Sequence, residues 1–135
     1  PQAVYRPRRR GRPGAVLWGG RAGVSACADV RSRRLADVFA RRFPAAASDS
    51  RPAAGLPSSL AIFRSARPLV PVSRVCLHDC LALIDWLGPD ARGVTLVLGV
   101  SAFPFAAHCW LQADGAVVDD HPESPSRYQP ILHLP

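Results

Sequence analysis

The most regular pattern of apolar positions lies between residues 73 and 89. Apolar side chains recur there at spacings of three and four residues, which places them on one face of a helix; they are Leu77, Cys80, Leu81, Ile84 and Leu87. Ser73 is a residue type that caps helix N-termini, and Gly88-Pro89 ends the run. The pattern therefore predicts a helix that begins just after Ser73 and ends before Gly88.

Strand patterns follow this helix. The continuous apolar run VTLVLGV at 94–100 is typical of a central strand. Two shorter runs, AHCWLQ at 107–112 and AVVDD at 116–120, flank the three-residue loop Ala113-Asp114-Gly115. Two strand-like runs around a short loop that contains glycine predict a β-hairpin.

The final apolar run, YQPILHL at 128–134, predicts one more strand. Pro130 lies inside this run and has no N–H to donate to a sheet, which favours an edge strand or a bulge. One helix followed by antiparallel strands predicts an α+β fold, with the helix packed on the sheet.

The N-terminal half shows weaker patterns. Near-helical spacing over residues 29–43 predicts a short amphipathic helix with an arginine face, and Ser59 is a candidate cap for a second helix that Pro68 ends. Residues 1–14 have no apolar periodicity and are typical of a solvated tail. We therefore expect two parts: a basic, partly disordered or helical region at 1–58, and a domain at 59–135.

Charge and cysteine content narrow the expected partners and compartment. The net charge is +7, and residues 1–42 carry eleven of the seventeen arginines with only two acids. Such a basic half could meet an acidic partner, a nucleic acid or a membrane surface. No nucleic-acid motif, secretory signal or membrane-length apolar run is present, so we expect no nucleic acid, no membrane and a cytoplasmic protein with reduced thiols.

Three residues of the C-terminal domain combine into candidate catalytic chemistry. Cys76 falls in the first turn of the predicted helix, where free N–H groups and the helix dipole stabilise a thiolate. If Gln112 and Ala116 close the hairpin loop, His108 faces Asp120 across the ladder, and that carboxylate can orient the imidazole as a base. The pattern predicts a triad of Cys76, His108 and Asp120, whereas a one-residue slip would present Asp119 instead.

Other interpretations of the same residues stay open. Cysteines on apolar faces usually belong to the core, which is how we interpret Cys80 and Cys109. Alternatively, Cys76, Cys80, Cys109 and His108 could bind zinc, although adjacent residues such as His108 and Cys109 point to opposite faces of a strand.

The last sixty residues resemble the leader peptidases of lasso peptide biosynthesis, the B2 or B proteins, which have a papain-like or transglutaminase-like cysteine protease domain. Ordered blocks at the family's spacing carry the resemblance: Cys76-Leu77-His78-Asp79-Cys80-Leu81-Ala82-Leu83, Gly99-Val100, Pro104-Phe105-Ala106-Ala107-His108-Cys109-Trp110, Asp114-Gly115, Asp120 and Tyr128-Gln129-Pro130-Ile131. The family's serine is replaced by Cys80, and residues 1–58 match no part of the family pattern.

This resemblance implies a function and a set of partners. Cys76 would be the nucleophile, His108 the base and Asp120 the orienting acid of an endopeptidase that cuts the leader from a ribosomally made precursor. The implied partners are the precursor peptide, a leader-recognition domain and a macrolactam-forming cyclase that uses ATP. No cofactor is required for hydrolysis itself.

Two alternative functions remain. The same triad could transfer an acyl group to an amine, as transglutaminases do. The chain could instead be a non-catalytic peptide-binding module, although the complete set of Cys76, His108 and Asp120 argues against that interpretation.

Overall fold

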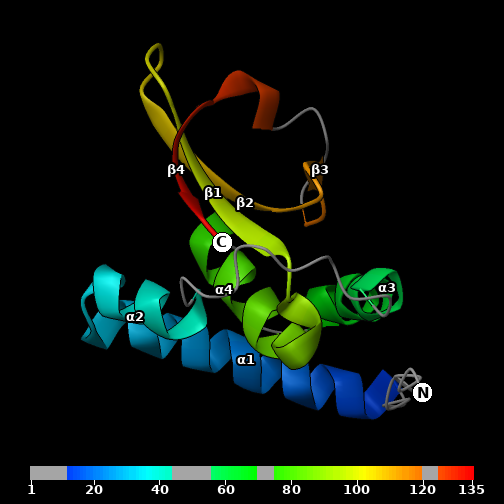
Figure 1. Ribbon diagram of the computed structural model, residues 1–135. Coiled ribbons are helices and arrows are strands. Elements are labelled where there is room, and N and C mark those ends of the chain that lie inside the picture. The colour runs from blue at the N-terminus through cyan, green and yellow to red at the C-terminus, as the bar shows by residue number, and fades with distance from the viewer. Residues whose placement is uncertain (1–11, 44–55, 70–74, 120–124) are drawn as a thin grey trace, which may run out of the picture.

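The computed structural model describes residues 12–43, 56–69, 75–119 and 125–135, which form an α+β fold (Figure 1). The helices are α1 (Arg12–Ser32), α2 (Leu35–Arg42), α3 (Leu56–Ala66) and α4 (Cys76–Leu87). The strands are β1 (Val94–Ser101), β2 (Ala106–Ala113), β3 (Ala116–Val117) and β4 (Gln129–Leu134). The predicted fold class is therefore confirmed.

The strands form an antiparallel sheet in the order β3-β2-β1-β4. The apolar run in β1 is central as predicted, and it pairs with β2 from Val94↔Ala113 to Ser101↔Ala106. β4 is an edge strand, and its register against β1 shifts between Leu98 and Gly99. This irregularity agrees with the edge or bulge that Pro130 predicts.

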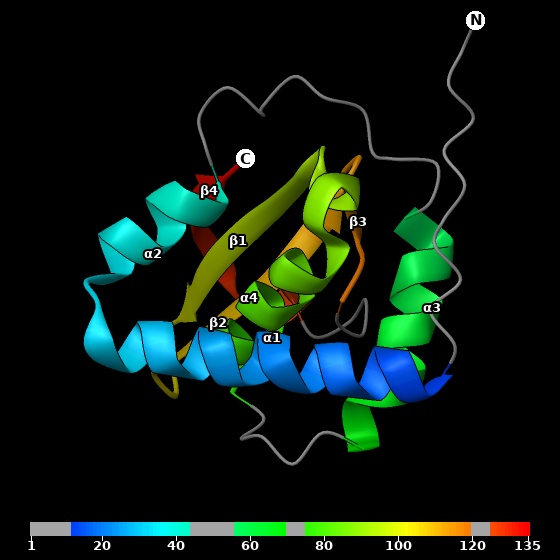
Figure 2. The ribbon, with the colours of Figure 1, turned by 90° about the horizontal axis from the view of Figure 1, so that it is seen from below.

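Helix α4 lies between the sheet and α1. Figures 1 and 2 show α1 crossing the side of α4 that faces away from the sheet. Helix α2 lies near the C-terminal end of α1, and α3 lies near the N-terminal end of α1. Ala22 and Ala26 of α1 are buried in the same core as the apolar face of α4. Their small side chains let α1 and α4 approach each other closely. None of the helices among the described residues is long and apolar enough to cross a membrane.

The start of α4 differs from the prediction. Cys76 is the first helical residue, and the cap position is Val75, whose extended backbone (φ −96°, ψ 131°) breaks the helix. Ser73, the predicted cap, lies outside the described residues. The side chain of valine has no hydrogen-bond acceptor, so Val75 does not cap the backbone N–H groups of the first helical turn.

The N-terminal helices also correct the sequence interpretation. The single helix predicted over 29–43 is two helices, because Arg34 adopts an extended backbone (ψ 137°) between α1 and α2. The long helix α1 was not predicted, because small residues dilute its apolar pattern. Helix α3 begins at Leu56, so Ser59 is not its cap and instead donates a hydrogen bond to Asp90. The division at residue 58 stays a prediction.

The register predicted for the hairpin is wrong by one residue. Ala113 pairs with Ala116 and Gln112 with Val117, so the loop contains only Asp114 and Gly115. Both loop residues have positive φ, 49° and 75°, as a two-residue turn that follows the sheet twist requires. The predicted ladder that set His108 opposite Asp120 therefore does not form, and Asp120 itself lies outside the described residues.

Candidate active site

Cys76 stands at the N-terminus of α4, half-buried at the side of the sheet. It is the first residue of the helix, and Asp79 N–H donates to the carbonyl of Val75 one turn later. The N–H groups of the first helical turn have no partner within the helix and can bind a developing negative charge. The position of Cys76 therefore suits a nucleophile whose attack creates an oxyanion.

His108 is held on β2 by aromatic neighbours. It pairs with Gly99 of β1, and its ring lies 6.0 Å from the Trp110 ring and 5.2 Å from the Tyr128 ring, centroid to centroid. A Cβ atom on Gly99 would approach both Trp110 Cη2 and Tyr128 Cβ to 2.9 Å. The missing side chain of Gly99 therefore makes room for the aromatic pair that flanks His108.

The structure brings Cys76 and His108 together, and Cys109 lies beside them. A hydrogen bond with the Cys109 thiol, together with burial, raises the pKa of Cys76 above its usual range, whereas a hydrogen bond to the His108 side chain lowers it. The Cys109 hydrogen bond and burial outweigh the effect of His108, so the pKa of Cys76 is raised. The helix terminus alone led us to expect a stabilised thiolate, but the neighbouring thiol reverses this expectation, so Cys76 is protonated at neutral pH.

Cys80 and Cys109 extend this site into a cluster of three thiols. Cys80 Sγ lies 3.8 Å from Cys109 Sγ, and both residues are almost fully buried, as predicted for core cysteines. A hydrogen bond with Cys109 lowers the pKa of Cys80, but burial and the nearby Asp119 carboxylate outweigh it and raise the pKa to about 12. A hydrogen bond with Cys76 lowers the pKa of Cys109, but a hydrogen bond with Cys80 and burial outweigh it and raise this pKa too, so both thiols are protonated at neutral pH.

Asp119 occupies a position that the sequence did not predict. Its Oδ1 accepts a hydrogen bond from Leu111 N–H at 2.6 Å, and Cys80 Sγ lies 3.1 Å from its Oδ2. The carboxylate thus ties the segment that follows β3 to β2 and to helix α4. Asp120 follows it directly, and its assignment as the orienting acid stays a prediction because its position is outside the described residues.

The zinc alternative finds no support in the described part of the chain. Within residues 12–43, 56–69, 75–119 and 125–135, no group of three or more His, Cys, Asp or Glu side chains is arranged to hold a metal ion. Cys80 instead engages Cys109 and Asp119, and Cys76 engages Cys109 and His108.

A concavity opens along the same face of α4 that carries Cys76. It has a volume of about 290 Å³. Its lining comes from α3 and the turn that follows it, from α4 and from the segment after β3: Phe63, Arg64, Arg67, Pro68, Asp79, Leu83 and Asp119. Asp79 and Leu83 lie three and seven residues after Cys76, which is one helical stripe. Space for a substrate side chain therefore exists one turn from the thiol.

Comparison with known proteins settles the family. The transglutaminase-like superfamily matches residues 22–133. The chain belongs to this superfamily. The match covers α1 from Ala22 onward as well as the sheet. Membership of the superfamily indicates a domain of the cysteine-protease or acyltransferase type. No match was found among curated proteins or among solved structures.

Sequence reasoning missed several contacts in this transglutaminase-like domain. The proximity of Cys109 to Cys76 is one, because Cys109 alternates with His108 along β2 and was expected to serve only the core. Another is Cys27 of α1, whose Sγ lies 3.3 Å from Nδ1 of His78. A glycine inside the apolar run of β1 was the available signal for the close packing around His108.

Proposed function

We propose that this chain is the leader peptidase of a lasso peptide pathway, a cysteine endopeptidase that uses Cys76, His108 and Asp120. The observation that carries the proposal is the position of Cys76 at the N-terminus of α4, close enough to His108 of strand β2 for the imidazole to act on the pKa of the thiol. Membership of the transglutaminase-like superfamily supports a cysteine-based acyl transfer. The ordered motif blocks through Tyr128-Gln129-Pro130-Ile131 support the narrower assignment to leader peptidases.

The raised pKa of Cys76 shapes the proposed mechanism. Because the thiol is protonated, His108 removes its proton as Sγ attacks the scissile carbonyl, which makes His108 a general base. The tetrahedral oxyanion forms beside the N–H groups at the start of α4. The histidinium then protonates the leaving amine, an acyl group stays on Cys76, and water deprotonated by His108 hydrolyses this thioester.

The proposed partners follow from the same assignment. The precursor peptide is the substrate, a leader-recognition domain presents it, and an ATP-using cyclase closes the macrolactam ring after cleavage. Hydrolysis by a thiol and an imidazole needs no cofactor. All of these steps would take place in the cytoplasm, where the thiols stay reduced.

The test is cleavage of the native precursor by the purified chain together with its recognition partner, followed by mass spectrometry. We expect a leader fragment and a core fragment that add up to the precursor plus one water. Cys76→Ala should abolish both products, and Cys80→Ser, which keeps a small polar side chain, should not. Intact precursor under these conditions would contradict the proposal.

A second arm separates hydrolysis from acyl transfer. Addition of a primary amine such as cadaverine should leave the products of a hydrolase unchanged. If the main product instead carried the mass of the amine, the chain would be a transglutaminase-like acyltransferase on the same nucleophile.

A further inference from the structure

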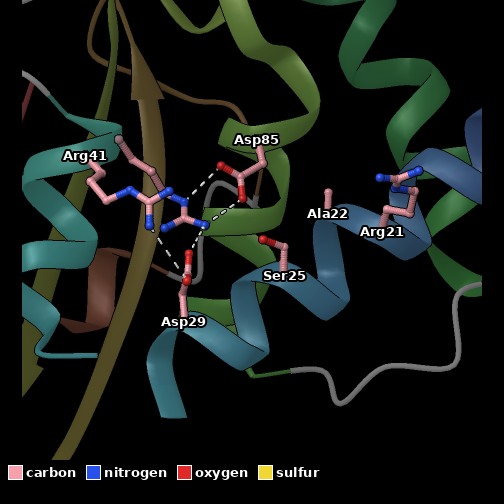
Figure 3. Close-up of a pocket in the computed structure, with 7 residues that line it drawn as sticks. Arg21, Ala22, Ser25, Asp29, Arg41 and Asp85 are labelled. Carbon is pink, nitrogen blue, oxygen red and sulfur yellow. Dashed lines mark hydrogen bonds and ion pairs between the residues drawn. The ribbon is translucent and has the colours of Figure 1, made fainter. Parts of the chain in front are cut away.

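A second cavity lies on the opposite side of α4 from the candidate nucleophile. It has a volume of about 330 Å³, is open to solvent and is lined by α1, α2 and the C-terminal half of α4 (Figure 3). Its lining is strongly polar: Arg21, Ala22, Ser25, Asp29, Arg41, Arg42 and Asp85. Three arginines face two aspartates, so the cavity carries an excess of positive charge.

Arg42 bridges both aspartates and still has an unused donor. Its side chain is only 7% exposed, its Nη2 lies 2.8 Å from Asp29 Oδ2 and 2.7 Å from Asp85 Oδ2, and its Nε donates to Asp85 Oδ1. Nη1 is buried and has no hydrogen-bond acceptor. A buried cationic donor without an acceptor costs free energy that an incoming ligand oxygen can recover.

The two remaining arginines are available at the ends of the cavity. Arg41 is 59% exposed and approaches Asp29 only to 3.9 Å, and Arg21 is exposed and pairs with no acid among the described residues. Figure 3 shows Arg21 and Arg41 at opposite ends of a row, with Ser25 between them. Arg21 and Asp29, which lies beside Arg41, are eight residues apart on α1, so about 12 Å of helix separates the two ends of the row.

We propose that this cavity binds two carboxylates of an acidic peptide, one near Arg41 and Arg42 and one near Arg21. A planar carboxylate matches the guanidinium fork and carries one charge, so it is repelled less by Asp29 and Asp85 than a phosphate dianion would be. A spacing of about 13 Å corresponds to acidic residues four positions apart in an extended chain, whose side chains point to the same side.

The inference rests on the proposed function in one respect: the acidic peptide would be part of the precursor. Asp85 is nine residues from Cys76, which places it about 13 Å further along α4 and on the opposite face. Across the width of the helix the separation is roughly 17 Å, so at least about five extended residues must lie between the acidic segment and the scissile bond.

The experiment measures binding separately from cleavage. The probe is a fluorescein-labelled glycine-serine octapeptide with two glutamates four positions apart and an amidated C-terminus, and its control has glutamines instead. Fluorescence anisotropy follows its binding to the full chain carrying Cys76→Ala. We expect Arg21→Gln and Arg41→Gln each to raise Kd about two- to fivefold, as for exposed ion pairs, and the double variant to raise it further.

The matched control is Arg31→Gln, which removes the same charge from an exposed position of α1 outside the cavity. It should leave Kd unchanged. An equal loss with Arg31→Gln, or no binding of the glutamate probe at millimolar protein, would overturn the proposal. Tighter binding of a fluorescein-labelled ten-residue oligothymidylate, lost in the same two variants, would assign the cavity to nucleic acid and overturn it as well.

Cleavage of the native precursor distinguishes this inference from the proposed function. If wild-type protein cleaves the precursor and the arginine variants bind the probe normally, only the cavity assignment fails. If the probe binds through Arg21 and Arg41 but the precursor stays intact, only the peptidase assignment fails.

Discussion

Gly99 shows how a single residue positions the candidate base. A methyl group at this position would meet Trp110 and Tyr128 at 2.9 Å, and one of the two contacts is a Cβ atom that cannot turn away. We predict that Gly99→Ala destabilises the protein by about 1–3 kcal/mol, as overpacking does, and slows cleavage by displacing the ring of His108. Thermal unfolding and precursor cleavage measure the two effects.

Gly20→Ala is the control for this prediction. A Cβ atom at Gly20 has no neighbour within 4 Å, and the residue lies inside helix α1. Alanine should therefore stabilise the protein, by up to about 1 kcal/mol, through its better helix propensity. Loss of stability in both variants would show that the close approach at Gly99 is not the cause.

The thiol pair Cys76 and Cys109 leads to a prediction about pH. Because the hydrogen bond with Cys109 raises the pKa of Cys76, the fraction of thiolate should grow about tenfold per pH unit between pH 7 and pH 9. The rate of iodoacetamide labelling at Cys76, followed by peptide mass spectrometry, should rise accordingly. Cys109→Ala should lower the pKa of Cys76 and accelerate labelling at each pH below 9.

The opposite result has a clear meaning. A labelling rate that is already constant from pH 7 to pH 9 in the wild type would show a preformed thiolate–imidazolium pair. His108 would then act first as a counter-ion rather than as a base.

At the scale of elements, the short strand β3 depends on one carboxylate. Only Ala116 and Val117 pair in the ladder, and Asp119 continues the attachment through Leu111 N–H. We predict that Asp119→Ala lowers the free energy of unfolding by about 1–3 kcal/mol because it leaves that N–H unsatisfied. Asp119→Asn should cost less, since an amide oxygen can still accept. Urea unfolding monitored by circular dichroism measures both; equal losses would contradict this role.

The same elements show what sequence patterns can predict. Helix α4 and strand β1 were predicted because one has a strong helical period and the other a continuous apolar run, and both signals are local. The hairpin register was wrong because Ala113 can belong to the strand or to the loop, and only the positive φ of Asp114 decides between them. The contact of Cys109 with Cys76 depends on how α4 docks on β2, which no local pattern contains.

At the scale of the whole molecule, Arg42 joins three helices. It contacts Asp29 of α1 and Asp85 of α4 from its place at the end of α2. We predict that Arg42→Met destabilises the protein by about 2–3 kcal/mol, less than for a fully buried pair because Asp85 is 27% exposed. Arg41→Gln should cost little, because its contact with Asp29 is exposed. Thermal unfolding of both variants measures the difference.

The effect of Arg42 should depend on pH with a defined sign. The hydrogen bond from Arg42 is the largest cause that lowers the pKa of Asp29 below 3.8. A lowered carboxyl pKa contributes stability above the pKa of the unfolded chain, and this contribution disappears as pH falls through the folded pKa. The difference between wild type and Arg42→Met should therefore shrink below about pH 4. A constant difference down to pH 2 would contradict the ion pair as its source.

The edge strand β4 has a consequence for how copies of this chain meet. Ile131 is 64% exposed and Leu132 39% exposed, which is the kind of open, apolar border along which sheets grow into fibrils. Pro130 withholds one N–H from any strand that would add there, and the register shift at Leu98 and Gly99 bends the border away from a flat template. We therefore expect the proline that marks the edge also to hinder polymerisation of concentrated protein.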